Sequence, residues 1–158
     1  MFTELFKSFH LLVFSFILPD YWLAYDSWLG PYRKGLNRLK DTIIAEELDE
    51  YVNNMRGDVR KIDIANEKVD LIFSNELLCE LDRSGLESAF SEFYRVLKKG
   101  GKLIHVELDP VPENRAQELL IEADLHYSSE YLPFQGERWF SPLVNELLLL
   151  MEEAGFKT

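Results

Sequence analysis

Apolar and polar positions follow two different periods in the centre of the chain. Val69–Phe73 and Leu103–Leu108 are short apolar runs, and each predicts a buried strand. Between them, Gly85–Lys99 repeats apolar residues at spacings of three and four, which predicts an amphipathic helix. Gly100-Gly101 follows and is typical of a helix end. A strand, a helix and a strand in this order predict a crossover unit with two parallel strands.

Polar side chains stand directly behind the first of these strands. They are Ser74, Asn75 and Glu76. In open parallel sheets, ligands bind outside the carboxyl ends of the strands. We therefore expect function at these three residues.

The same reading predicts elements over the rest of the chain. Phe9–Leu18 is strongly apolar but too short for a membrane-spanning helix, which needs about 20 residues; it predicts a buried helix or strand. The other expected elements are helices at Tyr21–Leu39, Asp41–Met55, Asn114 to about His126 and Leu143–Ala154, a strand at Val59–Ile64 and an aromatic loop at Tyr127–Phe140. The expected N-caps are Asp82 or Ser84 for the central helix and Ser141, with Pro142 behind it, for the last one.

Several of these segments resemble one known family. The strand Asp70-Leu71-Ile72, the loop Ser74-Asn75, the helix end Tyr94-Arg95-Val96-Leu97-Lys98-Lys99-Gly100-Gly101 and the strand Lys102-Leu103-Ile104-His105-Val106 are similar to the central part of class I S-adenosylmethionine-dependent methyltransferases. The resemblance covers about Asp58 to Phe156. It implies an α/β fold with a three-layer, Rossmann-like sheet and S-adenosylmethionine as the cofactor.

The resemblance also assigns candidate residues. Asp63 matches the position where an acidic side chain accepts a hydrogen bond from the adenine amino group, and Ser74, Asn75 and Glu76 match the cofactor loop. Tyr25 belongs to a segment that such enzymes place before their first strand. For the substrate, the expected residues are Tyr25, Tyr131, Arg138 and Trp139. Glu80 stands where many members have His, so no general base is assigned.

Parts of the family pattern are not recognisable in this chain. The glycine-rich turn after the first strand has no counterpart, since Gly30, Gly35, Gly57 and Gly85 are isolated. No residue is evident for the acidic position that ends the next strand and holds the ribose hydroxyls. The last two strands are not recognisable either. The sheet therefore looks incomplete.

Net charge and cysteine content limit the classes of partner and the compartment expected for this protein. A net charge of −11 disfavours a nucleic-acid surface, which needs basic residues. The single Cys79 excludes an internal disulfide and suits a reducing compartment, so a cytoplasmic protein is expected. No spacing of Cys and His predicts a metal site, and no membrane association is expected.

These observations predict one domain, residues 1–158, with a helical and aromatic N-terminal segment 1–40 and a methyltransferase-like core 58–158. The first functional hypothesis is methyl transfer from S-adenosylmethionine to a small molecule or a protein. The alternatives are a degenerate, non-catalytic binding domain and a fragment of a longer enzyme. Three parallel strands alone would leave exposed edges. We therefore expect Phe9–Leu18 to add a strand, or a second copy to cover an edge, unless residues are missing.

Overall fold

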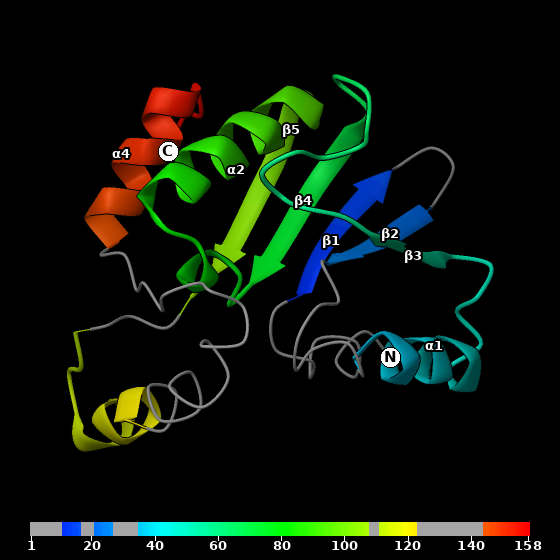
Figure 1. Ribbon diagram of the computed structural model, residues 1–158, viewed down its shortest axis with the longest axis horizontal. Coiled ribbons are helices and arrows are strands. Elements are labelled where there is room, and N and C mark those ends of the chain that lie inside the picture. Colours follow the sequence, from blue (N-terminus) through cyan, green and yellow to red (C-terminus); the bar gives the residue numbers. More distant parts are fainter. Residues whose placement is uncertain (1–10, 17–20, 27–34, 108–110, 123–143) are drawn as a thin grey trace.

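A five-stranded sheet forms the centre of the molecule (Figure 1). The computed structural model describes residues 11–16, 21–26, 35–107, 111–122 and 144–158. The strands are β1 (Leu11–Phe16), β2 (Tyr21–Asp26), β3 (Val52–Arg56), β4 (Val69–Asn75) and β5 (Leu97–Val106), in the order β3-β2-β1-β4-β5.

The central strand runs against all the others. β1 pairs antiparallel with both β2 and β4, whereas β2 with β3 and β4 with β5 are parallel pairs. β2, β3, β4 and β5 therefore point the same way, and their carboxyl ends share one edge of the sheet. The amino end of β1 lies at that edge, because Leu11 pairs with Asn75 at the end of β4.

Two crossover units cover opposite faces of the sheet. Helix α1 (Gly35–Ala45) joins β2 to β3, and helix α2 (Arg83–Val96) joins β4 to β5. The α1 side is a small core of Ala24, Leu39, Ile43, Leu48 and Val52, with Phe73 packed against it. The α2 side is a larger core that includes Leu23, Tyr25, Ile72 and the buried positions of α2. Successive residues of β2 and β4 thus point into different cores, as strand geometry requires.

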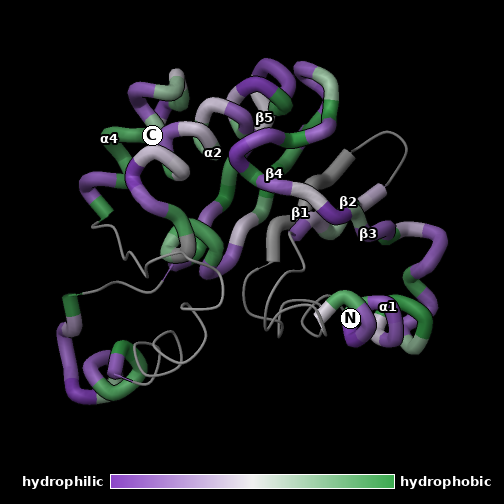
Figure 2. The backbone as a smooth tube through the Cα atoms, in the orientation of Figure 1, coloured by the Kyte–Doolittle hydropathy of each residue, from purple (hydrophilic) through white to green (hydrophobic). Residues whose placement is uncertain are grey.

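Helix α2 forms because its sequence supplies both a cap and an apolar face. Asp82 is the N-cap, and its Oδ1 accepts a hydrogen bond of 2.7 Å from the Gly85 amide. The face buried under the sheet consists of Leu86, Ala89, Phe90, Phe93 and Val96. Helix α4 (Val144–Ala154) packs on α2 through Leu147 and Leu150. Figure 2 shows the resulting alternation of hydrophilic and hydrophobic stretches along these helices.

Arg95 fixes the long connection between β3 and β4. Its guanidinium donates to the carbonyl oxygens of Ile62 and Ile64, each at 2.8 Å, and to Asn66 Oδ1 at 2.8 Å. Glu92, one turn earlier on α2, holds the same guanidinium and accepts from the Ile62 amide at 2.7 Å. A segment without helix or strand is thereby ordered against the end of α2.

The predicted crossover is confirmed with shifted ends. β4 and α2 are present, and Asp82 is the N-cap as expected. The helix ends at Val96, three residues before the expected end, because Leu97 already pairs with Val69 in the sheet. Gly100, with φ +82°, therefore lies within β5 and not at a helix cap. Phe9–Leu18 does contribute a strand, β1.

Three predictions for the first half of the chain are wrong. Tyr21–Asp26 is strand β2, although a helix was expected there. Val52–Arg56 is strand β3, which overlaps the end of the helix expected at Asp41–Met55. The expected strand Val59–Ile64 is a loop, in which Val59 and Ile62 are buried at a spacing of three. β2 is an inner strand buried on both faces, so it lacks the apolar–polar alternation that marks a half-buried strand.

In the second half of the chain, the described helices agree with the expected ones. Residues 115–122 are helical within the range expected from Asn114. Helix α4, Val144–Ala154, lies within the expected range, and Gly155 follows it with φ +105°. Ser141, Pro142 and the aromatic loop Tyr127–Phe140 lie outside the described residues.

Candidate functional site

The connections of the sheet identify the edge where a ligand should bind. From β2 the chain moves outward to β3 with α1 on one face, and from β4 it moves outward to β5 with α2 on the other. The direction reverses between β2 and β4, over the amino end of β1. Ligands of open α/β sheets bind at the carboxyl ends of the strands at such a switch point. The groups beside it are Asp26 on β2 and Asn75 on β4.

Asp26 and Asn75 lie on the same side of the sheet. Asp26 comes two residues after Ala24 on β2, and Asn75 comes two residues after Phe73 on β4. Ala24 and Phe73 belong to the α1-side core, and residues two apart on a strand share a face. One strand separates them, so their Cα atoms are about 10 Å apart at ordinary strand spacing. Asp26 is 8% exposed, and its carbonyl accepts from the Gly57 amide at 3.0 Å. Asp26 was not predicted as a site residue, because no strand was expected at β2, which Asp26 ends.

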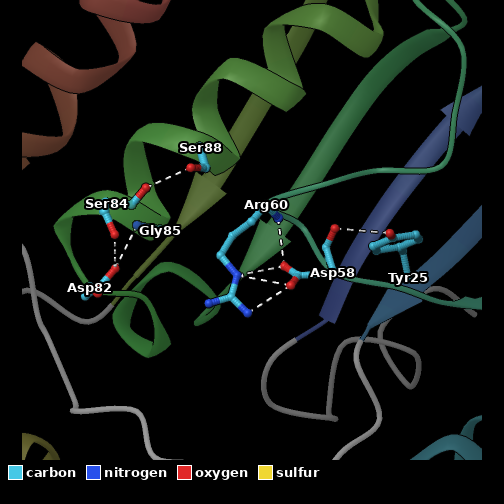
Figure 3. A network of polar contacts seen from close by, with 7 residues as sticks. All are labelled: Tyr25, Asp58, Arg60, Asp82, Ser84, Gly85 and Ser88. Atoms are coloured by element: carbon cyan, nitrogen blue, oxygen red, sulfur yellow. Dashed lines mark hydrogen bonds and ion pairs between the residues drawn. The ribbon is translucent and has the colours of Figure 1, made fainter.

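The turn after β3 carries an ion pair beside this edge (Figure 3). Arg60 holds both oxygens of Asp58, with Nε 2.9 Å from Oδ1 and Nη2 2.8 Å from Oδ2. These hydrogen bonds hold the pKa of Asp58 below its ordinary value, against the opposing effect of partial burial. Both side chains are nearly half exposed, so the pair is open to solvent and to a ligand.

Tyr25 supports that turn from below. Its side chain is 1% exposed, and its hydroxyl donates to the Asp58 carbonyl at 3.2 Å. Burial, and then the charge of Asp58, raise the pKa of the Tyr25 hydroxyl. A Cβ atom on Gly57 would stand 1.8 Å from the Tyr25 Oη, so the ring fits only beneath a glycine. Tyr25, expected to contact substrate, is thus placed in the core under the turn.

Asp63, the expected adenine partner, lies in the loop after this turn. It is exposed, and the buried Ile62 precedes it. Because β3 ends at Arg56, the carboxylate next to the strand end is Asp58 and not Asp63. The two acidic residues belong to the same connection, which Arg95 holds against α2.

The three residues expected behind β4 are brought to the edge, but they do not share one surface. Ser74 is the last fully buried residue of β4 and faces the α2 side, where its Oγ lies 2.8 Å from His105 Nδ1. Asn75 faces the other side and is half-buried. Glu76 has a left-handed backbone with φ 45°, and its amide donates to the Val106 carbonyl at 2.9 Å.

Two residues of the β5 end also reach this region and were not expected from the sequence. Glu107 Oε1 accepts from the Leu78 amide at 2.7 Å, and His105 Nε2 lies 3.3 Å from the same oxygen. Leu78 begins the short 3-10 helix η3 (Leu78–Glu80) in the loop that follows Glu76. The available signal was the polar pair His105 and Glu107, two positions apart at the end of an otherwise apolar run.

The described edge carries charges of both signs, with a small excess of acidic residues. Asp26, Asp58, Asp63 and Glu76 are acidic, whereas the basic residues are Arg56 at the end of β3, Arg60 and Lys61. Arg60 is bound to Asp58. Asp82, farther along at the start of α2, has its pKa lowered chiefly by the hydrogen bond from the Gly85 amide, with Arg60 adding a smaller effect. The carboxylates at this edge can accept hydrogen bonds from the hydroxyl or amino donors of a ligand.

The structure describes only some of the remaining candidate residues. Tyr131, Arg138 and Trp139 lie outside the described residues. Cys79 is buried in η3, with Sγ 3.5 Å from the Glu76 carbonyl oxygen. Within the described ranges, no group of three or more His, Cys, Asp or Glu residues could hold a metal ion. None of the described helices is long and apolar enough to cross a membrane.

Comparisons with known proteins point to one family. Residues 33–105 match a family model described as a methyltransferase domain. No curated protein matches the chain.

Several solved structures are similar to the chain. One is an S-adenosylmethionine-dependent methyltransferase of Thermotoga maritima, called a possible histamine N-methyltransferase, with 23% identity and a TM-score of 0.54 over 86% of this chain and 63% of that protein. A methyltransferase of Methanococcus maripaludis has 19% identity and a TM-score of 0.52, over 86% and 68%. A third, from Bacillus halodurans, has 23% identity and a TM-score of 0.56, over 85% and 52%. The chain thus spans less than two thirds of the length of the first and the third.

Proposed function

Because the chain has the fold of class I S-adenosylmethionine-dependent methyltransferases and matches their domain over residues 33–105, we propose that it binds S-adenosylmethionine and transfers its methyl group. The observation that carries the proposal is the pair Asp26 and Asn75. They lie on one side of the sheet, across the switch point, where the carboxyl ends of parallel strands meet. The acceptor we propose is a small molecule or a protein.

The residues at this edge fit a nucleoside. Asp26 ends the strand after the first one, which is the position where the family holds the ribose hydroxyls with an acidic side chain. A carboxylate that is mostly buried accepts hydroxyl hydrogen bonds more strongly than an exposed one. Asn75 and the backbone at Glu76 would line the opposite side. Ser74, which is fully buried, would act from beneath by holding the strand end in place.

When bound, S-adenosylmethionine supplies an electrophilic methyl group on a positively charged sulfur. The carboxylate of Asp26 would favour that charge, and the chain's own part is to orient the cofactor and exclude water. No residue at the edge is required to take a proton for an acceptor that is already nucleophilic, so no catalytic residue is assigned.

Calorimetric titration with S-adenosylhomocysteine tests the proposal. The 158-residue chain should bind it, and Asp26→Asn should weaken binding on the order of tenfold, since hydrogen bonds to a charged acceptor contribute about 1.5–3 kcal/mol. Asp49→Asn is the matched control, because Asp49 is an exposed aspartate of the turn between α1 and β3. Equal affinities of Asp26→Asn and the native chain would contradict the role of Asp26.

A second pair of variants identifies the adenine partner. Asp63→Asn should weaken binding if Asp63 accepts the adenine amino group, as the resemblance implies. Asp58→Asn should do so if the carboxylate nearest the end of β3 serves instead. Asp58 must then share its oxygens with Arg60, which occupies both of them in the free protein.

A specific observation favours the alternative of a binding domain without catalysis. β1 runs antiparallel to its neighbours, so its amino end, Leu11, lies at the candidate edge of the sheet. In the family, the first strand ends at this edge and continues into a glycine-rich turn. A close backbone approach to the cofactor at that turn depends on glycine. If the folded chain fails to bind both S-adenosylmethionine and S-adenosylhomocysteine, this second function is the better one.

The acceptor side remains a prediction. We propose Tyr131, Arg138 and Trp139 as acceptor contacts on the sequence resemblance alone. Tyr25 is left out of this set, because it is buried under the turn after β3. Alanine substitution of Arg138 should raise the KM for an anionic acceptor and leave the affinity for S-adenosylhomocysteine unchanged. A cytoplasmic location is likewise a proposal, and cell fractionation would test it.

A further inference from the structure

A buried polar cluster on the α2 side of the sheet has no part in the proposed cofactor contacts. It consists of Ser74 on β4 and of His105 and Glu107 at the end of β5. Ser74 and His105 are neighbours in the parallel register, and the Ser74 Oγ lies 2.8 Å from His105 Nδ1. The side chains of His105 and Glu107 are 11% and 10% exposed. Three polar side chains are thus withdrawn from water beside an apolar core.

The order serine, histidine, carboxylate does not make this a nucleophilic site. Ser74 is 0% exposed, so no substrate reaches its hydroxyl. A nucleophilic serine must stand open at the surface of its pocket. The cluster instead has a structural role, through the backbone amide that Glu107 binds.

Glu107 connects the end of β5 to the loop that leaves β4. Its Oε1 accepts the Leu78 amide at 2.7 Å, and Leu78 is itself 0% exposed. Leu78 opens η3, three residues after Asn75 at the candidate edge. A backbone bond also ties this loop to β5, from the Glu76 amide to the Val106 carbonyl, at 2.9 Å. Glu107 is therefore the side-chain anchor of the loop that presents Asn75 and Glu76.

His105 keeps Glu107 in its position. A carboxylate removed from water needs a partner with positive character. His105 Nε2 is 3.3 Å from Oε1, within ion-pair distance but without hydrogen-bond alignment, and among the described residues it has no hydrogen-bond partner. A lone pair on Nε2 would repel the carboxylate, so we assign the proton to Nε2. Nδ1 then meets the Ser74 hydroxyl.

We propose that Glu107 is a positioning residue for the loop of residues 75–80, held in place by His105 and Ser74. The carboxylate fixes the Leu78 amide, and the imidazole fixes the carboxylate. Only the consequence for ligand affinity rests on the proposed function, because the order of the loop is a property of the free chain.

Amide hydrogen exchange of the full chain, read at Leu78 by NMR, tests the inference. Glu107→Ala should speed the exchange of that amide by roughly tenfold or more, since a buried donor loses its acceptor. Glu107→Gln keeps an oxygen at the same position and should restore most of the protection. Glu113→Ala, at an exposed glutamate, is the control and should leave Leu78 unchanged. Should Glu107→Ala fail to fold, Glu107→Asp takes its place, because the shorter side chain cannot span the same distance.

The results separate the inference from the proposed function. Unchanged exchange at Leu78 in Glu107→Ala, or equal acceleration in Glu107→Gln and Glu107→Ala, would overturn the positioning role. If the native chain binds S-adenosylhomocysteine, Glu107→Ala should weaken that binding and Glu107→Gln should weaken it less. If the native chain does not bind it, the proposed function fails, and the exchange measurement still decides the role of Glu107.

Discussion

At the scale of single residues, the turn after β3 depends on the absence of one side chain. Gly57 lies against the ring of Tyr25, which is buried under the turn that carries Asp58 and Arg60. The glycine is needed here for space and not for an unusual backbone angle. The position of the ion pair at the site edge is thus set by packing beneath it.

We expect Gly57→Ala to destabilise the protein by about 1–3 kcal/mol, as overpacking of a filled core does. The added Cβ would meet Tyr25 Oη at 1.8 Å and Cζ at 2.2 Å. Urea unfolding would measure the loss. In the background of Tyr25→Leu the same substitution should have a clearly smaller effect, and equal losses in both backgrounds would show that the tyrosine is not the cause.

At the scale of elements, the connection from β3 to β4 is held by charge. Arg95 and Glu92 on α2 bind its backbone at Ile62 and Ile64. The hydrogen bond from Arg95 is the main reason that the pKa of Glu92 lies below its ordinary value. A carboxylate with a lowered pKa in the folded state adds stability above its unfolded pKa, and that stability is lost as the pH falls through the folded value.

Glu92→Gln should therefore lower the free energy of unfolding by about 1 kcal/mol at neutral pH. Below the ordinary pKa of 4.5, the native chain should lose stability more steeply than the variant. Urea unfolding at several pH values between neutral and acid gives both curves. Parallel curves would mean that Glu92 is not a source of the pH dependence; Asp58, whose pKa is also lowered, supplies part of the slope in both proteins.

Some elements could be predicted from the sequence and others could not. The unit β4–α2–β5 was predicted because its signals are local: apolar runs, a 3.6-residue period and an N-cap at Asp82. β2 was missed because both of its faces are buried, so its aromatic residues fit a helical spacing as well. For the same reason Asp26, which ends β2, was not predicted as a site residue. The contact of Ser74 with His105 joins residues 31 positions apart and depends on strand register, which no local pattern specifies.

At the scale of the whole molecule, the sheet has an edge with apolar residues beside it. In the described part of the chain, β5 has β4 as its only neighbour. Ile104 and Val106 on β5 are each 46% exposed, on the side away from α2. Long edge strands with apolar side chains tend to pair with another chain. We propose that a second copy of this chain covers the edge.

The mass in solution tests this proposal. Light scattering should give a dimer for the native chain and a monomer for Ile104→Lys, because a charge on an edge strand opposes pairing. Ile44→Lys, at an exposed isoleucine of α1, is the matched control and should leave the mass unchanged. A native monomer would exclude the second copy as the cover of β5.

Charge acts at the same scale on the choice of partner. With a net charge of −11, the chain should repel the phosphate backbone of nucleic acids. Fluorescence anisotropy with a labelled single-stranded RNA should show no binding at physiological salt. Saturable binding would redirect the search for an acceptor towards RNA.

The reversed central strand has a consequence for how the chain is synthesised. Leu12 of β1 pairs with Tyr25 on one side and with Ser74 on the other. The first partner leaves the ribosome soon after β1, whereas the second follows much later. The side of β1 that pairs with β4 therefore has no partner strand while the chain through α1 and β3 is made. Such open sides are where nascent chains associate wrongly. The hazard therefore falls on β1, the central strand, whose second side is covered only when β4 has been made.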